Sequence, residues 1–194
     1  MAYSSAFTPK GFTDLGGYDW AKDAIDNLAE QGVVNGTSAT TFAPGKNITR
    51  ADFALMMVRA FKLESDSTEN FADVDPNAYY AEALAIGKAN GILNGVGNDK
   101  YNPTATITRQ DMMTVVSRAL KALGYELKAA DEDTLAAFVD AATIADYAYE
   151  HVAALVANEL VKGKTENTID PKAYTTRAEV AVLIERLMNT FLEK

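Results

Sequence analysis

The sequence predicts a mainly α-helical protein made of three copies of one module of about 60 residues. Three observations carry this prediction. Similar motifs recur three times in the same order, and each copy has two segments with the apolar spacing of a helix. The remaining apolar pieces are pairs such as Val33-Val34, which are too short for a real sheet. Short β-bridges or hairpins are the most that is expected between the helices.

The repeat is defined by landmarks that recur at matching distances. Each copy has a Phe-x-Asp opening, a loop glycine, a proline and a Thr-Arg pair. These landmarks begin at Phe12, Gly36, Pro44 and Thr49 in the first copy, Phe71, Gly95, Pro103 and Thr108 in the second, and Phe138, Gly163, Pro171 and Thr176 in the third. An insertion near residues 121–137 lengthens the last interval. We expect repeats at 10–65, 66–126 and 127–194 that form one compact unit.

The first helix of each copy follows the Phe-x-Asp opening. In the first copy Ile25 and Leu28 are three residues apart, which places them on one helical face. Gly32 and its counterpart Gly91 are expected to end these helices, because glycine adopts the left-handed conformation easily. The third copy has Glu159 at that position, which predicts a different helix end there.

The second helix of each copy carries a broad apolar stripe. In the first copy the stripe is Phe53, Met56, Met57, Ala60 and Phe61, with the i, i+3, i+4, i+7, i+8 pattern of an amphipathic helix. Equivalent stripes occur in the other two copies. Three similar amphipathic helices in one chain are expected to pack together about a pseudo-threefold axis.

Each second helix also begins with the pattern of a capping box. The threonine hydroxyl would accept a hydrogen bond from the third helical amide, and the carboxylate would reach back to the amide of the threonine. The expected pairs are Thr49 with Asp52, Thr108 with Asp111, and Thr176 with Glu179.

The arginine after each threonine is not explained by helix formation. A cation at the first helical position lies beside the positive end of the helix dipole and costs about 0.3–1 kcal/mol. Two interpretations stay open: an anion site formed with free helix amides, or a bridge to an acidic residue of the next copy. The acidic candidates are Asp14, Asp73 and Asp140. A second aligned set, interpreted as structural, is Arg59, Arg118 and Arg186.

Composition excludes several function classes. The net charge of −9 argues against wholesale binding to nucleic acid or to an anionic membrane. The absence of cysteine excludes disulfides, thiolate metal sites and cysteine nucleophiles. His151 is the only histidine and has no counterpart in the other copies, so it is interpreted as a surface or packing residue. We therefore expect no catalytic residue, no metal and no cofactor.

The order of these motifs resembles the S-layer homology (SLH) module over about residues 10–194. The most specific part is the Thr-Arg-Ala-Glu motif, which stands here as Thr49-Arg50-Ala51-Asp52, Thr108-Arg109-Gln110-Asp111 and Thr176-Arg177-Ala178-Glu179. The resemblance implies a three-pronged spindle around a central three-helix bundle, with ligand grooves between adjacent modules. Gln110 and Asp111 depart from the motif, so the grooves are not expected to be equivalent.

The resemblance also implies a function. SLH modules anchor secreted proteins to the Gram-positive cell wall without a covalent bond. They bind an anionic secondary cell-wall polysaccharide, often through a terminal pyruvylated N-acetylmannosamine. The alternative is a structural module that joins protein neighbours in an S-layer lattice. Neither implies an enzyme, a nucleic acid or a membrane as partner, and the expected state is a monomeric pseudo-trimer with lattice neighbours as further partners.

The implied site residues are of four kinds, each present once per copy. An arginine binds the pyruvate carboxylate, a threonine caps the helix and touches ligand, a glycine lets sugar approach the backbone, and an aromatic ring stacks on the sugar. In that order they are Arg50, Arg109 and Arg177; Thr49, Thr108 and Thr176; Gly36, Gly95 and Gly163; and Trp20, Tyr79 and Tyr147. For the aromatic residues, core packing stays open as a second interpretation. Caps of the first helices are assigned to Asp14, Asp73 and Asp140, and caps of the second to Asp52, Asp111 and Glu179.

Overall fold

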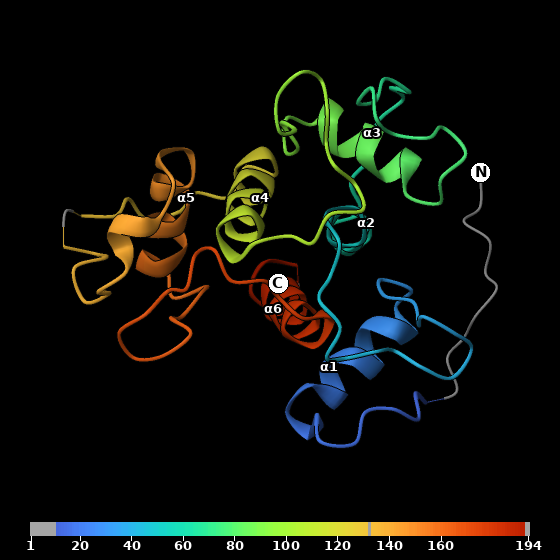
Figure 1. Ribbon diagram of the computed structural model, residues 1–194, viewed down its shortest axis with the longest axis horizontal. Coiled ribbons are helices and arrows are strands. Elements are labelled where there is room, and N and C mark those ends of the chain that lie inside the picture. Colours follow the sequence, from blue (N-terminus) through green and yellow to red (C-terminus); the bar gives the residue numbers. More distant parts are fainter. Residues whose placement is uncertain (1–10, 132, 193–194) are drawn as a thin grey trace.

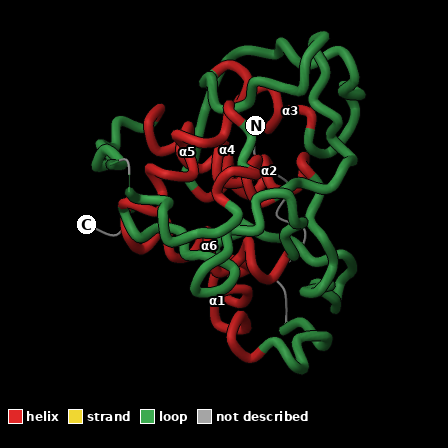
Figure 2. The backbone as a smooth tube through the Cα atoms, turned by 60° about the vertical axis from the view of Figure 1, so that its left-hand side comes forward, coloured by secondary structure: helices red, strands yellow, loops and turns green. Residues whose placement is uncertain are grey.

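The computed structural model describes residues 11–131 and 133–192, so the outermost residues of the expected first and third repeats lie outside it. The helices are α1 (Asp19–Glu30), α2 (Arg50–Ala60), α3 (Ala81–Ala89), α4 (Arg109–Ala122), α5 (Asp146–Ala157) and α6 (Arg177–Phe191), with a 3₁₀ turn η1 (Ala141–Thr143). Long loops join them (Figure 2). The predicted mainly α-helical class is confirmed. None of these helices combines the length and apolar character needed to cross a bilayer.

Each first helix packs on the second helix of the preceding copy. Helix α3 lies on α2, α5 lies on α4, and α1 of the first copy packs on α6 of the third. Figure 1 shows α1, α3 and α5 on the outer side of the helices that they cover. Helix α2 also contacts both α4 and α6. The copies are therefore interlocked, because each buries its first helix against a neighbour.

The segments before the second helices join the copies a second time. Isolated antiparallel bridges connect Thr49 with Thr106, Thr108 with Tyr174, and Thr176 with Asn47. These pairs hold equivalent positions and run from the first copy to the second, from the second to the third, and from the third to the first. They are single bridges without strands in the described chain, as the sequence predicts.

Helix α2 is buried on more sides than the predicted apolar stripe covers. The stripe residues Phe53 and Met57 are buried as expected, and so are Leu55 and Val58, which lie outside the stripe. The reason is that α2 packs on α3, α4 and α6 at once. An amphipathic pattern with one apolar face describes a helix with one packed side, and it underestimates burial for a helix with three neighbours.

Glu159 overturns the prediction that the third copy ends its first helix differently. Its φ of 58° lies in the left-handed region, like the 71° of Gly32 and the 69° of Gly91. The third copy therefore uses the same helix end without the glycine that makes it easy. For a residue with a side chain this conformation costs about 1–2 kcal/mol.

Replacing Glu159 with glycine is expected to stabilise the fold. The relief of left-handed strain exceeds the extra backbone entropy of an unfolded glycine, for a net gain of about 0.5–1 kcal/mol in the free energy of unfolding. The melting temperature would then rise by about 1–4 °C. The matched control is Gly32→Ala, which is expected to lower the melting temperature. No rise for Glu159→Gly would contradict the strain argument.

Candidate functional site

The three motif arginines reach into the next copy. Each Nε donates to a main-chain carbonyl of the aromatic-x-Pro element, or its equivalent, at 2.9 Å. The pairs are Arg50 with Tyr101, Arg109 with Ile169, and Arg177 with Phe42. The guanidinium groups of Arg50 and Arg177 also lie 4.8 and 4.4 Å from the ring centres of Tyr101 and Phe42. All three arginines therefore bridge to the next copy through carbonyls. Among the described residues, Arg50 alone also bridges to an acidic residue there, Asp111, at 2.9 Å.

Asp14, Asp73 and Asp140 do not have the roles predicted for them. The first helices have no side-chain cap, and the motif arginines make no ion pair with these aspartates in the described chain. Each aspartate instead accepts two successive amides in a loop of its own copy. Asp73 accepts those of Tyr101 and Asn102 at 2.9 Å each. Asn102 has a φ of 54°, so the carboxylate fixes a left-handed loop whose amides need a partner.

The helix amides expected to bind an anion are already occupied. The amide of Arg50 donates to Ala105 O at 2.8 Å, and that of Ala51 donates to Pro103 O at 3.0 Å. Equivalent bonds form at the starts of α4 and α6. The third amide of α2 goes to the hydroxyl of Thr49 at 3.1 Å. The prediction of free amides is therefore wrong, and the guanidinium is the donor group that remains for a ligand.

The three threonines cap their helices as predicted, but the full capping box forms only in α6. There Glu179 Oε2 accepts the amide of Thr176 at 2.8 Å. Aspartate is one methylene shorter. The oxygens of Asp52 and Asp111 turn outward instead and accept hydroxyls, those of Tyr79 and Tyr147, at 2.6 Å each.

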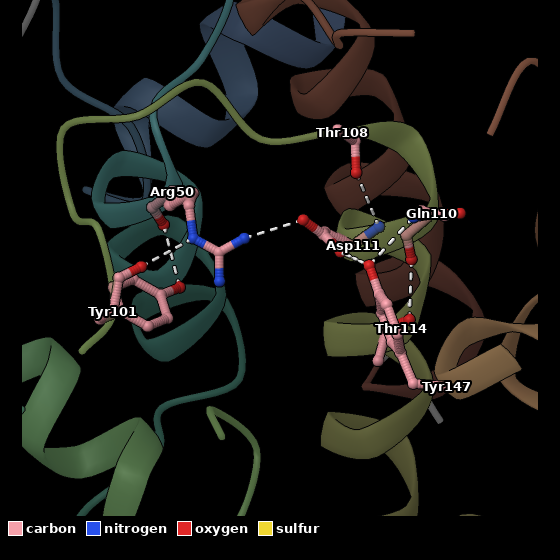
Figure 3. Close-up of polar contacts among 7 residues, drawn as sticks. All are labelled: Arg50, Tyr101, Thr108, Gln110, Asp111, Thr114 and Tyr147. Atoms are coloured by element: carbon pink, nitrogen blue, oxygen red, sulfur yellow. Dashed lines mark hydrogen bonds and ion pairs between the residues drawn. The ribbon is translucent and has the colours of Figure 1, made fainter. Parts of the chain in front are cut away.

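One cavity, of about 410 Å³, brings together predicted residues from all three copies. Arg50 comes from α2, Gly95 from the loop after α3, and Tyr147 from α5, and we call this cavity the Arg50 groove. Asp111 of α4 lies between the guanidinium of Arg50 and the hydroxyl of Tyr147 (Figure 3). Its Oδ2 pairs with Arg50 Nη1 at 2.9 Å, and its Oδ1 accepts the Tyr147 hydroxyl at 2.6 Å. The motif departure Gln110 also binds that hydroxyl, at 3.0 Å.

A second cavity, of about 340 Å³, has the same plan one copy further along the chain. Arg109 comes from α4, Gly163 from the loop after α5, and Trp20 from α1, and we call this cavity the Arg109 groove. Trp20 reaches it because α1 packs on α6. The carboxylate of this groove, Glu179, pairs with Lys164 rather than with the arginine.

The third set of predicted residues is Arg177, Gly36 and Tyr79. Arg177 Nη2 donates to the carbonyl of Asn35 at 2.7 Å, next to Gly36. The Tyr79 hydroxyl donates to Asp52 at 2.6 Å. Burial lowers the pKa of Arg177, and the negative charge of Asp52 opposes this effect. The three sets thus follow one rule, with the arginine, the glycine and the aromatic residue each contributed by a different copy.

Two of the motif arginines are buried without an ion pair in the described part of the chain. Burial lowers the pKa of Arg109 and of Arg177, while neighbouring carboxylates oppose this effect. Within the described residues, Arg50 is the only motif arginine in an ion pair. A buried guanidinium that is bound only to carbonyls gains free energy from an added carboxylate.

A model of the S-layer homology domain matches residues 11–54, 70–113 and 137–181. These segments cover more than half of the chain and fall on the three copies that the repeat defines. The chain belongs to the S-layer homology domain family.

The proteins that this S-layer homology chain is similar to have differing names. The chain is 33% identical over 186 residues to the surface-layer 125 kDa protein of Lysinibacillus sphaericus, covering 94% of this chain and 15% of that protein. It is 34% identical over 177 residues to an endoglucanase of Bacillus sp. (strain KSM-635), covering 91% and 18%. It is 32% identical over 185 residues to the S-layer protein sap of Bacillus anthracis, covering 94% and 22%. The chain thus spans less than a quarter of each of these proteins.

The exposed aromatic residues of the S-layer homology modules are not core residues. Trp20, Tyr79 and Tyr147 are 57%, 69% and 54% exposed, so the core-packing interpretation is wrong.

The loop glycines have a packing role that the sequence did not suggest. A Cβ on Gly163 would lie 2.7 Å from the ring of Phe138, so glycine is required there even without a ligand.

Two groove residues belong to the arginine set interpreted as structural from the sequence. Arg186 Nη1 reaches the carbonyl of Leu160 at 3.3 Å, as that interpretation expects. Arg118 lines the Arg50 groove, and Arg186 lines the Arg109 groove. Both belong to an arginine set that aligns in all three modules, and this alignment was the signal that pointed to them. The threonines were expected to touch a ligand. Thr108 and Thr176 cap helices but do not line either cavity.

The Tyr147 hydroxyl is expected to titrate far above an ordinary phenol. Burial, and then the hydrogen bond to Asp111, raises the pKa of Tyr147 to about 12. An unfolded tyrosine has a pKa of about 10, so the unfolded state holds fewer protons above that pH. The free energy of unfolding therefore falls as pH rises from about 10 to 12. Phenolate absorbance, with Tyr147→Phe for assignment, measures the pKa, and a value near 10 would contradict the hydrogen bond to Asp111.

Proposed function

We propose that this chain anchors a secreted surface protein to a Gram-positive cell wall by binding an anionic, pyruvylated secondary cell-wall polymer. The Arg109 groove carries the proposal, because it places a buried guanidinium, which has no ion pair among the described residues, beside an exposed indole ring. The guanidinium fork suits a carboxylate, and the indole face suits the apolar face of a sugar ring. Repeats 10–65, 66–126 and 127–194 act in this proposal as one binding unit.

Family membership supports the anchoring part of the proposal. The relatives include S-layer proteins and an endoglucanase, all matched over the same segment of this chain and over a minor part of their own length. A segment shared by proteins of such different names fits a common attachment role better than catalysis. We therefore assign no enzymatic activity to this segment.

The acidic surface is compatible with an anionic ligand. Fields from distant charges fade over about 8 Å at physiological ionic strength, whereas the groove cations would touch the ligand. Binding is therefore expected to weaken only modestly with added salt.

Co-sedimentation with purified cell-wall sacculi tests this function. Sacculi that retain the secondary polymer are expected to pull down the chain, and sacculi stripped of the polymer are expected to leave it in solution. Equal binding to both preparations would contradict the proposal. Self-association without any polymer would favour the alternative, a lattice assembly module.

A further inference from the structure

The two grooves share a plan but differ in charge. Four cationic side chains and one carboxylate line the Arg109 groove, namely Arg109, Arg186, Lys162, Lys164 and Glu179. Two cationic side chains and one carboxylate line the Arg50 groove, namely Arg50, Arg118 and Asp111. Asn94 and Val96 hold the positions of the two lysines, and Val96 is 50% exposed. The Arg50 groove therefore has a weaker positive potential and a more apolar rim.

The carboxylates of the grooves also sit differently. Asp111 pairs directly with Arg50 at 2.9 Å, so a ligand carboxylate would have to displace it or lie beside a like charge (Figure 3). The ion pair is largely buried, with side-chain exposures of 10% and 22%. Breaking a buried pair leaves a charge without its partner, which is unfavourable.

Glu179 leaves its arginine available because it is one methylene longer than Asp111. Its Oε2 completes the capping box by accepting the amide of Thr176 at 2.8 Å, and its Oε1 binds Lys164. Both oxygens are thus engaged away from Arg109, whose Nε and Nη2 donate to main-chain carbonyls at 2.9 and 3.4 Å. Between these two grooves, the aspartate pairs with its arginine, and the longer glutamate does not within the described chain.

The Arg109 groove also contains a polar atom that lacks a partner. Thr175 is 1% exposed and lines this groove, and its Oγ1 has no hydrogen-bond partner in the described chain. The equivalent residue of the second copy is the apolar Ile107. An unsatisfied buried hydroxyl is unfavourable, and a hydrogen bond to a ligand or a water can offset this.

We propose that the two grooves accept sugars of different charge. The Arg109 groove binds a carboxylate-bearing sugar of the polymer, and the Arg50 groove, which supplies its own carboxylate, binds an uncharged sugar unit. This inference rests on the proposed function, because it assigns two ligand classes within one polymer.

The chain contains a built-in reporter for one groove. Trp20 is its only tryptophan and lies in the Arg109 groove, so tryptophan fluorescence follows occupancy there. In the wild type, a pyruvylated N-acetylmannosamine glycoside is expected to change this fluorescence with an affinity at least about tenfold higher than that of its unpyruvylated counterpart. Calorimetry with both glycosides measures the total number of bound sugars.

Exchanging the groove features tests the cause. The variant Asp111→Glu with Val96→Lys is expected to increase the calorimetric stoichiometry for the pyruvylated glycoside and to leave the fluorescence titration unchanged. Glu179→Asp is expected to weaken the fluorescence-detected affinity about tenfold, because the shorter carboxylate can turn toward Arg109. Val96→Lys alone changes an exposed loop residue, so this variant is expected to fold like the wild type. The exposed Asp66→Glu is the matched control.

The outcomes separate the two claims. If the wild type binds the pyruvylated glycoside and neither exchange alters stoichiometry or affinity, the charge division is wrong and the anchoring function stands. The charge division is also wrong if Asp111→Glu with Val96→Lys changes the Trp20 titration as strongly as Glu179→Asp does. If the wild type responds to neither glycoside, both claims are wrong.

Discussion

Replacing Arg109 with glutamine is expected to weaken binding of the pyruvylated glycoside by about 10- to 150-fold, the loss of a charged hydrogen bond worth about 1.5–3 kcal/mol. Arg109 is buried, has no ion pair in the described chain, and faces a groove with three further cations. Its variant should lose affinity for the carboxylate-bearing sugar much more than for the uncharged one. Trp20 fluorescence reads out the affected groove directly.

Arg109 also binds the carbonyl of Ile169, so stability needs its own control. Lys62→Gln removes one exposed positive charge away from both cavities and controls for net charge. Thermal unfolding of Arg109→Gln shows whether the fold survives. A folded Arg109→Gln variant that binds the pyruvylated glycoside as tightly as the wild type would refute the role of this arginine.

Replacing Leu28 with alanine is expected to lower the free energy of unfolding by about 2–5 kcal/mol. Leu28 is fully buried on α1, which packs on α6 of the third copy. Because the copies are interlocked, the loss should lower the melting temperature of the whole chain in one transition. Trp20 lies on the same helix, so affinity in the Arg109 groove should fall as well.

Leu123→Ala is the matched control for this change. Leu123 follows α4 and is 36% exposed, so its truncation should alter the free energy of unfolding by less than about 1 kcal/mol. Denaturant unfolding followed by circular dichroism measures both variants. A Leu28→Ala chain with wild-type stability, or one in which α1 melts separately, would contradict the interlocked arrangement.

Features set by neighbouring residues could be predicted from the sequence. The threonine caps, the helical apolar stripes and the absence of long strands in the described chain all depend on local spacing, and the structure has them. The exposed position of Trp20 could not be decided in this way, because it depends on which helix α1 covers. That helix belongs to the third copy, far away in the chain.

The partners of the motif arginines were the main uncertainty, because tertiary contacts decide them. Arg50 could not be assigned to Tyr101 and Asp111 from spacing, since both belong to the next copy. Competition explains the aspartates: Asp73 has two adjacent loop amides within reach, and these outweigh a helix cap. Glu159 shows the limit of residue preferences, because the tertiary fold holds it in a conformation that glycine would adopt more easily.

The most direct test of the account is a crystal structure of the chain bound to the pyruvylated N-acetylmannosamine glycoside. We predict the carboxylate within hydrogen-bonding distance of the Arg109 guanidinium, about 2.7–3.2 Å, with the sugar ring against Trp20. A carboxylate bound away from the motif arginines, or a sugar that contacts only one copy, would contradict it.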